Sequence, residues 1–135
     1  MDLIVWRETF ETENLRVDNQ HKHLVDLINE LFNHLNTKDK DEKMKLIFTE
    51  LYEYTANHFT MEEEFMQEHK YIDYLKHKEE HVQFVAKVRD FKDRYFKGQA
   101  KINFELLNFL KDWLIKHIIG TDKATFAALK DKAGK

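Results

Sequence analysis

The sequence predicts an all-α protein: an up-down-up-down antiparallel four-helix bundle with an extended N-terminal arm and a short C-terminal helix. Its 135 residues contain no proline and three glycines, a composition that favours long helices over strands. Four segments repeat apolar residues every three or four positions, which is the period of one helix face. Short polar turns separate these segments, so we expect antiparallel neighbours in a single domain over residues 1–135.

Composition excludes several classes of protein. The hydrophobic share of 42% and the charged share of 35% are typical of a soluble globular domain, and the net charge of −3 comes without a basic stripe. We therefore expect no nucleic-acid partner. The lack of cysteine excludes disulfides, thiolate metal sites and iron–sulfur clusters. With no run of about 18 apolar residues and no signal peptide, we expect no membrane partner and a cytoplasmic location.

Residues 1–17 lack a helical period and predict an extended arm across the bundle. Trp6 is expected to anchor this arm, because leaving an indole in water is unfavourable. The first helix is expected over residues 18–36, with Asp18 as its N-cap. The inward stripe of this helix includes His21. Its apolar members are Leu24, Val25, Ile28, Leu31, Phe32 and Leu35.

The second and third helices, expected over residues 42–67 and 71–96, both carry polar pairs on their inward stripes. The pairs are His58 with Glu62 on the second helix, and His77 with His81 on the third. Residues four apart lie one turn apart on the same helix face, where both can bind one metal ion. An ionised carboxylate buried without a partner costs several kcal/mol, and a metal ion removes that cost.

The fourth helix is expected over residues 102–119, with His117 on its inward stripe. Asp122 follows five positions later, which corresponds to a rotation of about 500°, or roughly 140° away from the same face. Both residues can meet at one site only if the helix ends or distorts between them, and Gly120 makes this easy. A short final helix is expected over residues 123–130.

The placement of these residues predicts a metal site. A single histidine on an apolar stripe, such as His21 or His117 alone, is usually a core residue with a hydrogen-bond partner. Here five histidines and a glutamate fall on the inward stripes of four helices, at one end of the bundle. With Asp122 they give seven potential ligands, too many for one tetrahedral zinc. They suit two first-row transition ions bridged by the carboxylates.

Ligand chemistry alone leaves the metal open, because imidazole suits iron, copper, zinc and nickel. None of the eight histidines follows a glutamate by three positions, which argues against the di-iron oxidases with Glu-x-x-His motifs. His23, His34 and His69 lie off the inward stripes, and we expect them not to bind metal.

Across the whole chain, the order of these motifs resembles the hemerythrin family, specifically its bacterial members. The matching motifs are Val17-Asp18-Asn19-Gln20-His21, His58-Phe59-x-x-Glu62-Glu63, His77-x-x-x-His81 and Trp113-Leu114-x-x-His117-Ile118-x-x-x-Asp122, with Trp6 near the N-terminus. The resemblance implies two iron ions per chain in a non-haem centre. His77, His81 and His117 would hold one iron, and His21 and His58 the other, with an open position for O2. Glu62, Asp122 and an oxo or hydroxo group would bridge the two.

The resemblance also implies an apolar O2 pocket, although each of its residues could instead be ordinary core. The pocket residues are Leu24, Phe59, Trp113, Leu114 and Ile118. Leu24, Phe59 and Ile118 are expected to wall the iron with the open position, where an apolar lining excludes water and anions. One position departs from the family: many members have tyrosine three residues after the bridging aspartate, and here that residue is Thr125.

The function that the resemblance implies is reversible O2 binding for storage, delivery or sensing, by a protein that is not an enzyme. Two alternatives stay open: a di-iron peroxide or nitric oxide reductase, and an O2-sensing or redox-sensing regulatory domain. O2 is the expected ligand. The sequence does not identify an oxygen-consuming enzyme or a sensor partner.

Overall fold

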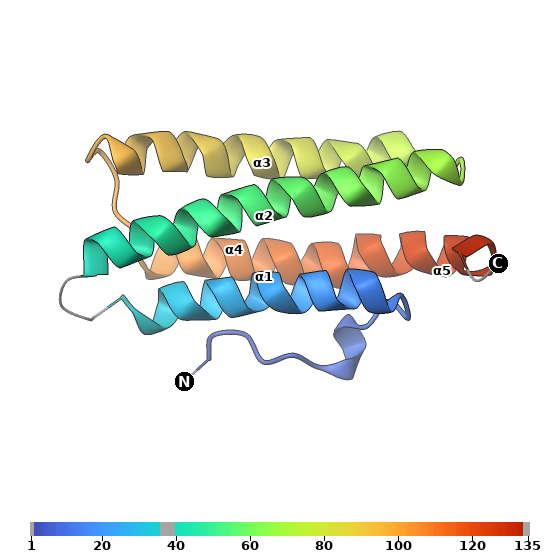
Figure 1. Ribbon diagram of the computed structural model, residues 1–135, viewed down its shortest axis with the longest axis horizontal. Coiled ribbons are helices and arrows are strands. Elements are labelled where there is room, and N and C mark those ends of the chain that lie inside the picture. Colours follow the sequence, from blue (N-terminus) through green and yellow to red (C-terminus); the bar gives the residue numbers. More distant parts are fainter. Residues whose placement is uncertain (1, 36–39, 134–135) are drawn as a thin grey trace.

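Four long helices run alternately up and down in the computed structural model, which describes residues 2–35 and 40–133 (Figure 1). They are α1 (Leu15–Asn33), α2 (Lys40–Glu68), α3 (Tyr74–Phe96) and α4 (Phe104–Lys116). A 3₁₀ turn, η1 (Glu8–Phe10), precedes them. The π-helical segment η2 (His117–Asp122) and the helix α5 (Lys123–Ala133) follow α4. The predicted all-α bundle, with its N-terminal arm and short C-terminal helix, is confirmed.

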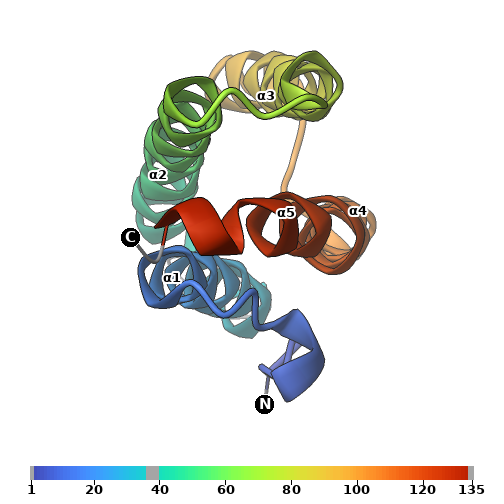
Figure 2. The same cartoon turned by 90° about the vertical axis from the view of Figure 1, so that its right-hand side faces the viewer.

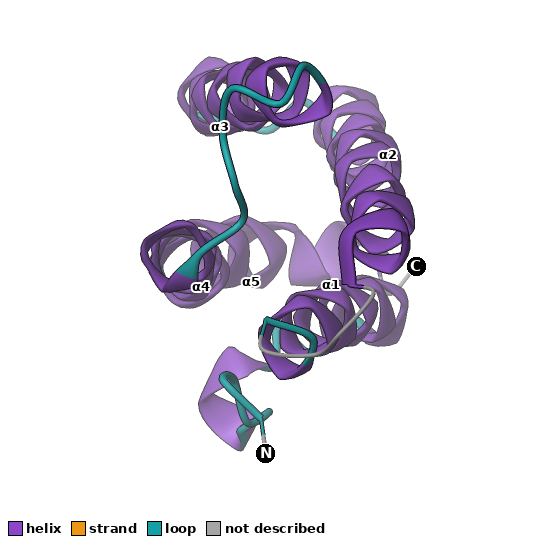
Figure 3. Ribbon diagram, turned by 90° about the vertical axis from the view of Figure 1, so that its left-hand side faces the viewer, coloured by secondary structure: helices purple, strands orange, loops and turns teal. Residues whose placement is uncertain are grey.

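The helices enclose one apolar core. Seen along the bundle, α1 lies beside α2 and α4, and α2 lies beside α3 (Figures 2 and 3). Each of the four helices buries apolar side chains in this core, among them Leu31, Phe48, Val88 and Leu110. Burial of this apolar surface is the main favourable contribution to folding. Of the described helices, none is long and apolar enough to span a membrane.

The helix boundaries differ from the expected ranges by a few residues. The first helix begins at Leu15 rather than at residue 18, and the third begins at Tyr74 rather than at residue 71. The second begins at Lys40, two residues early. The first helix ends at Asn33, earlier than the expected residue 36, which lies outside the described residues together with most of the polar turn after it.

The N-cap of α1 is Asn14, so the assignment of Asp18 as the cap was wrong. The Asn14 side chain accepts a hydrogen bond of 3.2 Å from the backbone N–H of Val17. Asp18 lies in the first turn, where its carboxylate accepts hydrogen bonds from the Thr12 backbone N–H at 2.9 Å and the Thr12 hydroxyl at 2.8 Å. Both residue types cap helices well. Here Asp18 instead fastens the arm to the helix.

A buried asparagine also holds the N-terminal arm, in addition to the expected Trp6. The backbone N–H of Ile4 donates to Asn29 Oδ1 at 2.8 Å, and Asn29 Nδ2 donates to the Ile4 carbonyl at 2.9 Å. Trp6 is half-buried against the core and packs edge-on against Phe10, with ring centroids 5.3 Å apart. Two hydrogen bonds to α1 therefore hold the arm, in addition to apolar contacts.

The helices α2 and α3 end in turns of the same type, and in each turn one residue adopts a left-handed conformation. That residue is Gly98 after α3, with φ of 76°, and Lys70 after α2, with φ of 53°. In each turn the backbone N–H of the residue that follows donates to the carbonyl five positions before it. The distance is 2.8 Å after Gly98 and 2.9 Å after Lys70. This pattern is the Schellman motif, which satisfies carbonyls at the helix end.

We predict opposite stability changes at these two positions. A side chain in the left-handed region costs roughly 1 kcal/mol relative to glycine, so Gly98→Ala should lower the thermal unfolding midpoint by about 3 °C. A Cβ at Gly98 meets no atom within 4 Å, so backbone strain alone acts there. Lys70→Gly should raise the midpoint by a similar amount. Circular dichroism melts measure both, and a change of the same sign in the two variants would contradict this account.

Candidate metal centre

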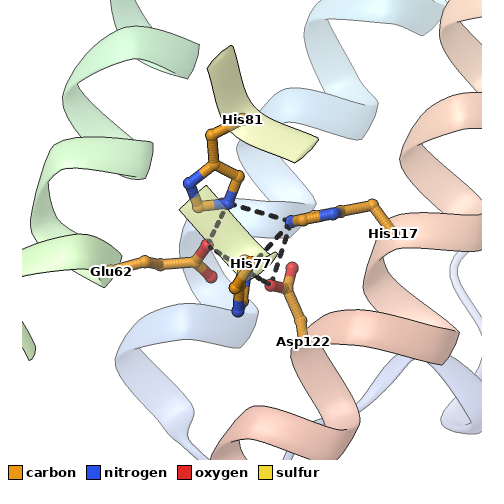
Figure 4. Close-up of side chains that lie close together, drawn as sticks. All are labelled: Glu62, His77, His81, His117 and Asp122. Atoms are coloured by element: carbon orange, nitrogen blue, oxygen red, sulfur yellow. Dashed lines mark hydrogen bonds and ion pairs between the residues drawn. The ribbon is translucent and has the colours of Figure 1, made fainter. Parts of the chain in front are cut away.

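Seven side chains that could bind a metal meet where α1 and α3 begin and α2 ends, beside the junction of η2 with α5. They are His21 from α1, His58 and Glu62 from α2, His77 and His81 from α3, and His117 and Asp122 from η2. Each is 3% exposed or less. The structure therefore brings together every ligand candidate that the sequence indicated, and Figure 4 shows five of them.

The π-helical turn of η2 brings its histidine and its aspartate to the same site. An α-helix would place residues five apart on different faces, but a π-helix bonds each N–H to the carbonyl five positions back and stacks such residues. His117 Nε2 lies 3.1 Å from Asp122 Oδ1. The distortion expected around Gly120 is therefore present, as a π-helix that continues from α4 into α5 rather than as a break.

Three of the imidazoles lie near one oxygen of the Asp122 carboxylate or one oxygen of the Glu62 carboxylate. The Nε2 atoms of His77 and His117 lie 3.0 and 3.1 Å from Asp122 Oδ1. The Nε2 atom of His81 lies 3.2 Å from Glu62 Oε1. Figure 4 shows these side chains converging on one point. This three-histidine group supplies five ligand atoms that can surround one metal ion.

The other two imidazoles face the second oxygen of each carboxylate. Asp122 Oδ2 lies 2.9 Å from His21 Nε2, and Glu62 Oε2 lies 3.2 Å from His58 Nε2. Glu62 and Asp122 therefore belong to both groups, with one oxygen directed to each. This is how carboxylates bridge two metal ions.

Many polar atoms of the cluster face a shared centre without a hydrogen bond, although His117 Nε2 lies 3.0 Å from His81 Nε2 and 3.3 Å from His77 Nε2. Among the described residues, no hydrogen-bond partner exists for the carboxylate oxygens of Glu62 and Asp122, for either ring nitrogen of His21, or for His58 Nε2. Leaving so many buried polar atoms unsatisfied is strongly unfavourable. Two metal ions would satisfy all of them except His21 Nδ1, so the donor set fits a binuclear centre.

The electrostatics of the cluster favour positive charge at its centre. Burial works against protonation of His21, but the Asp122 and Glu62 carboxylates outweigh it and raise its pKa to about 9. Burial likewise opposes the charged form of His117, yet Asp122 and Glu80 raise its pKa to about 10. Burial alone would raise the pKa of the Glu62 and Asp122 carboxyls, but the histidines hold both well below their ordinary range. Protons or metal ions can supply this charge, and metal binding displaces the protons.

Four of the five imidazoles are also held at Nδ1 by side chains outside the cluster. The pairs are His58 with Gln20 Oε1, His77 with Thr125 Oγ1 at 2.7 Å, His81 with Glu63 Oε2 at 3.0 Å, and His117 with Glu80 Oε1 at 2.9 Å. When Nε2 binds a metal ion, Nδ1–H donates to these oxygens. Such partners orient the ring and make it a stronger ligand.

The sequence patterns did not identify these partners, among them Glu80. Glu80 accepts hydrogen bonds from His117 and from the Thr121 hydroxyl, the latter at 2.8 Å. A signal was present in the sequence: Gln20, Glu63 and Glu80 each stand directly beside a ligand of their own helix. Each of them bonds a ligand on a different helix.

Thr125 supplies one of these partners, at the position where the resemblance to the family leads us to expect tyrosine. Its side chain is 1% exposed, and its hydroxyl lies 2.7 Å from His77 Nδ1. Threonine can therefore orient this imidazole, although its side chain is much shorter than that of tyrosine.

Two of the predicted pocket residues lie flat against imidazoles of the three-histidine group. The Phe59 ring stacks on His81, with centroids 3.8 Å apart and planes at 1°, and Trp113 stacks on His117 at 4.5 Å and 13°. Phe59 was expected beside the two-histidine group, but its centroid is farther from His58, at 5.9 Å. The other three, Leu24, Leu114 and Ile118, are buried in the core. The O2 pocket itself stays a prediction.

The histidines that lie off the inward stripes have other contacts. His23 lies 3.3 Å from a carboxylate oxygen of Glu50, and His34 Nδ1 lies 2.8 Å from the carbonyl oxygen of Glu30. The His69 ring packs edge-on against Phe65, at 4.5 Å. All three are outside the two groups of potential ligands.

We predict that His81→Ala loses metal, whereas His69→Ala keeps it. Removing the His81 imidazole takes one ligand from the three-histidine group, and loss of the metal leaves the buried Glu62 and Asp122 carboxylates uncompensated, which costs several kcal/mol. The His81 variant should therefore also melt at a lower temperature. Elemental analysis and circular dichroism test this. Loss of metal in the His69 variant but not in the His81 variant would mean that the cluster is not the metal site.

Comparisons with known proteins agree with this geometry. Residues 15–129 match the family model described as the hemerythrin HHE cation binding domain. A bacteriohemerythrin of Methylococcus capsulatus is 34% identical, over 91% of this chain and 94% of the relative. A hemerythrin of Sipunculus nudus is 36% identical, over 87% of this chain and 86% of the relative.

Solved structures show the same likeness. A wild-type hemerythrin is 32% identical and superposes with a TM-score of 0.86, covering 90% of this chain and 94% of that one. A variant with one leucine replaced by alanine superposes with a TM-score of 0.88 at 31% identity, covering 92% and 95%. The chain therefore belongs to the hemerythrin family, whose members bind O2 at a non-haem di-iron centre with histidine, glutamate and aspartate ligands.

Proposed function

We propose that this chain is an O2 carrier that binds and releases O2 without turning it over, for storage, delivery or sensing. The observation that carries the proposal is the sharing of Glu62 and Asp122 between two histidine groups of unequal size. The three-histidine group has five protein ligand atoms, and the two-histidine group has four. The smaller group therefore leaves one more coordination position for an external ligand.

The ligand assignment follows from this division. His77, His81 and His117 would hold one iron, His21 and His58 would hold the other, and both irons would share Glu62 and Asp122. The irons, when bound, supply the electrons that O2 accepts and returns. Five neutral imidazoles against two carboxylates place little negative charge on the centre. Such a ligand set favours the lower oxidation state, and with it reversible chemistry.

The surrounding residues fix the ligands and keep water away. Glu63 and Glu80 hold His81 and His117 by their Nδ1 atoms, so that the Nε2 atoms keep their direction. The stacked rings of Phe59 and Trp113 cover the same two imidazoles on the side of the core. An apolar cover of this kind excludes water and anions, and it thereby slows irreversible oxidation.

Iron loading followed by cycles of air and argon tests the proposal. Elemental analysis should find two irons per chain, and the visible spectrum that forms in air should revert under argon over repeated cycles. One zinc per chain, with no iron taken up after anaerobic loading, would contradict the di-iron assignment. Sustained turnover of peroxide or nitric oxide with a reductant would contradict a carrier.

We also predict that the iron centre of the Leu24→Ala variant oxidises irreversibly faster than that of the Leu31→Ala variant. Both leucines are fully buried on α1, at 1% and 0% exposed, and Leu24 lies one turn after His21. Each substitution costs about 2–5 kcal/mol by creating a cavity, so their effects on stability are matched. Only the cavity at Leu24 admits water beside the two-histidine group. The measurement is the decay of the visible spectrum in air, corrected for iron content, and equal decay in the two variants would remove Leu24 from the pocket.

A further inference from the structure

A cavity of about 190 Å³ opens beside the cluster, between the α2–α3 turn, the start of α3 and the junction of η2 with α5. Figure 2 looks onto this end of the bundle, with α3 above and α5 below. The cavity is lined by Asp73 and Glu80 on the α3 side, and by Gly120 and Ala124 on the other. Ala124 is exposed, so this edge of the cavity meets solvent.

The cavity reaches the cluster through one side chain. Its lining includes His77 and Thr125, which are only 2% and 1% exposed and are hydrogen-bonded to each other at 2.7 Å. The Nε2 atom of the same His77 lies 3.0 Å from Asp122 Oδ1 inside the cluster. A single imidazole therefore borders both the cavity and the metal ligands.

The chemistry of this opening suits a hydrated cation better than the core side of the cluster does. On the core side, Phe59 and Trp113 cover two imidazoles, and Leu24 and Ile118 are buried. A hydrated ion is strongly disfavoured in such apolar surroundings. The cavity lining contains two carboxylates, those of Asp73 and Glu80, and one ammonium group, that of Lys76. Their oxygens can replace water around a divalent ion.

We infer that this cavity is the route by which Fe2+ reaches and leaves the cluster. Asp73 and Glu80 receive the hydrated ion at the mouth, and the pair of His77 and Thr125 separates the mouth from the ligands. Movement of this pair then passes the ion inward. The inference rests on the proposed role of His77 as an iron ligand.

Iron release from the loaded protein tests the route. The reduced, iron-loaded protein is mixed with excess of an external ferrous chelator, and the coloured chelate is followed with time. Ala124→Trp places a large side chain at the rim and should slow release severalfold. Gly120→Leu is a second, independent block, since Gly120 also lines the cavity. A Cβ at Gly120 meets no atom within 4 Å, so a side chain can be added there. Ala128→Trp is the matched control, since Ala128 is an exposed alanine of the same helix outside the cavity lining.

Refilling the emptied protein with Fe2+ tests the charge at the mouth. Asp73→Asn should slow refilling by about tenfold at low salt, and the difference should shrink as salt screens the charge. Asp73 makes no capping hydrogen bond to α3, so the substitution leaves the helix start intact. Asp112→Asn, at an exposed position of α4 outside the lining, should refill at the rate of the parent.

The outcomes separate the route from the site. Release from both rim variants at the rate of the Ala128→Trp control, with unchanged thermal midpoints and two irons at the start, would overturn the route and leave the ligand assignment standing. A parent protein that never holds two irons would overturn the ligand assignment, and the route with it.

Discussion

Two buried carboxylates set the main constraint on this molecule. Glu62 and Asp122 are fully buried, and an uncompensated carboxylate inside a protein is strongly unfavourable. Their partners come from α1, α2, α3 and η2, so compensating these charges requires all of these elements to meet at one end. The cluster therefore cross-links the bundle at a place where apolar packing is interrupted. With metal ions present, the free energy of binding adds directly to the stability of the fold.

The geometry of bridging explains why one helix departs from α-helical form. A bridging carboxylate must direct one oxygen to each ion, and the spacing of four between His58 and Glu62 achieves this on α2. The spacing of five between His117 and Asp122 would fail on an α-helix, and the π-helical turn of η2 corrects it. Short π-helical turns are uncommon and occur mainly at functional sites. Here the turn lets Asp122 make contacts in both histidine groups.

The helix period identified six of the seven ligand candidates, because a ligand must point inward and the period of apolar residues shows which positions do so. Asp122 was not found in this way, since its spacing of five from His117 needed a distortion of the helix. The partners of the ligands were not found in this way. Glu63 and Glu80 lie at the edge of the inward stripe, where the sequence of one helix cannot distinguish a solvated carboxylate from one that reaches a neighbouring helix. That distinction depends on how adjacent helices are rotated. The prediction of where α1 begins was wrong for a different reason. Asn14 and Asp18 are both good caps, and only the path of the arm selects between them.

The cluster has two faces of opposite chemistry, and each suits one of the two species that must reach it. Phe59 and Trp113 stack on imidazoles toward the apolar core, which a small apolar gas enters more readily than water or an ion does. Toward the α2–α3 turn, Thr125 and Glu80 hold His77 and His117 beside a polar cavity. On the proposed assignment, O2 and Fe2+ therefore approach from different sides. A short side chain at Thr125 supports this separation, because it orients the imidazole while leaving polar space beside it.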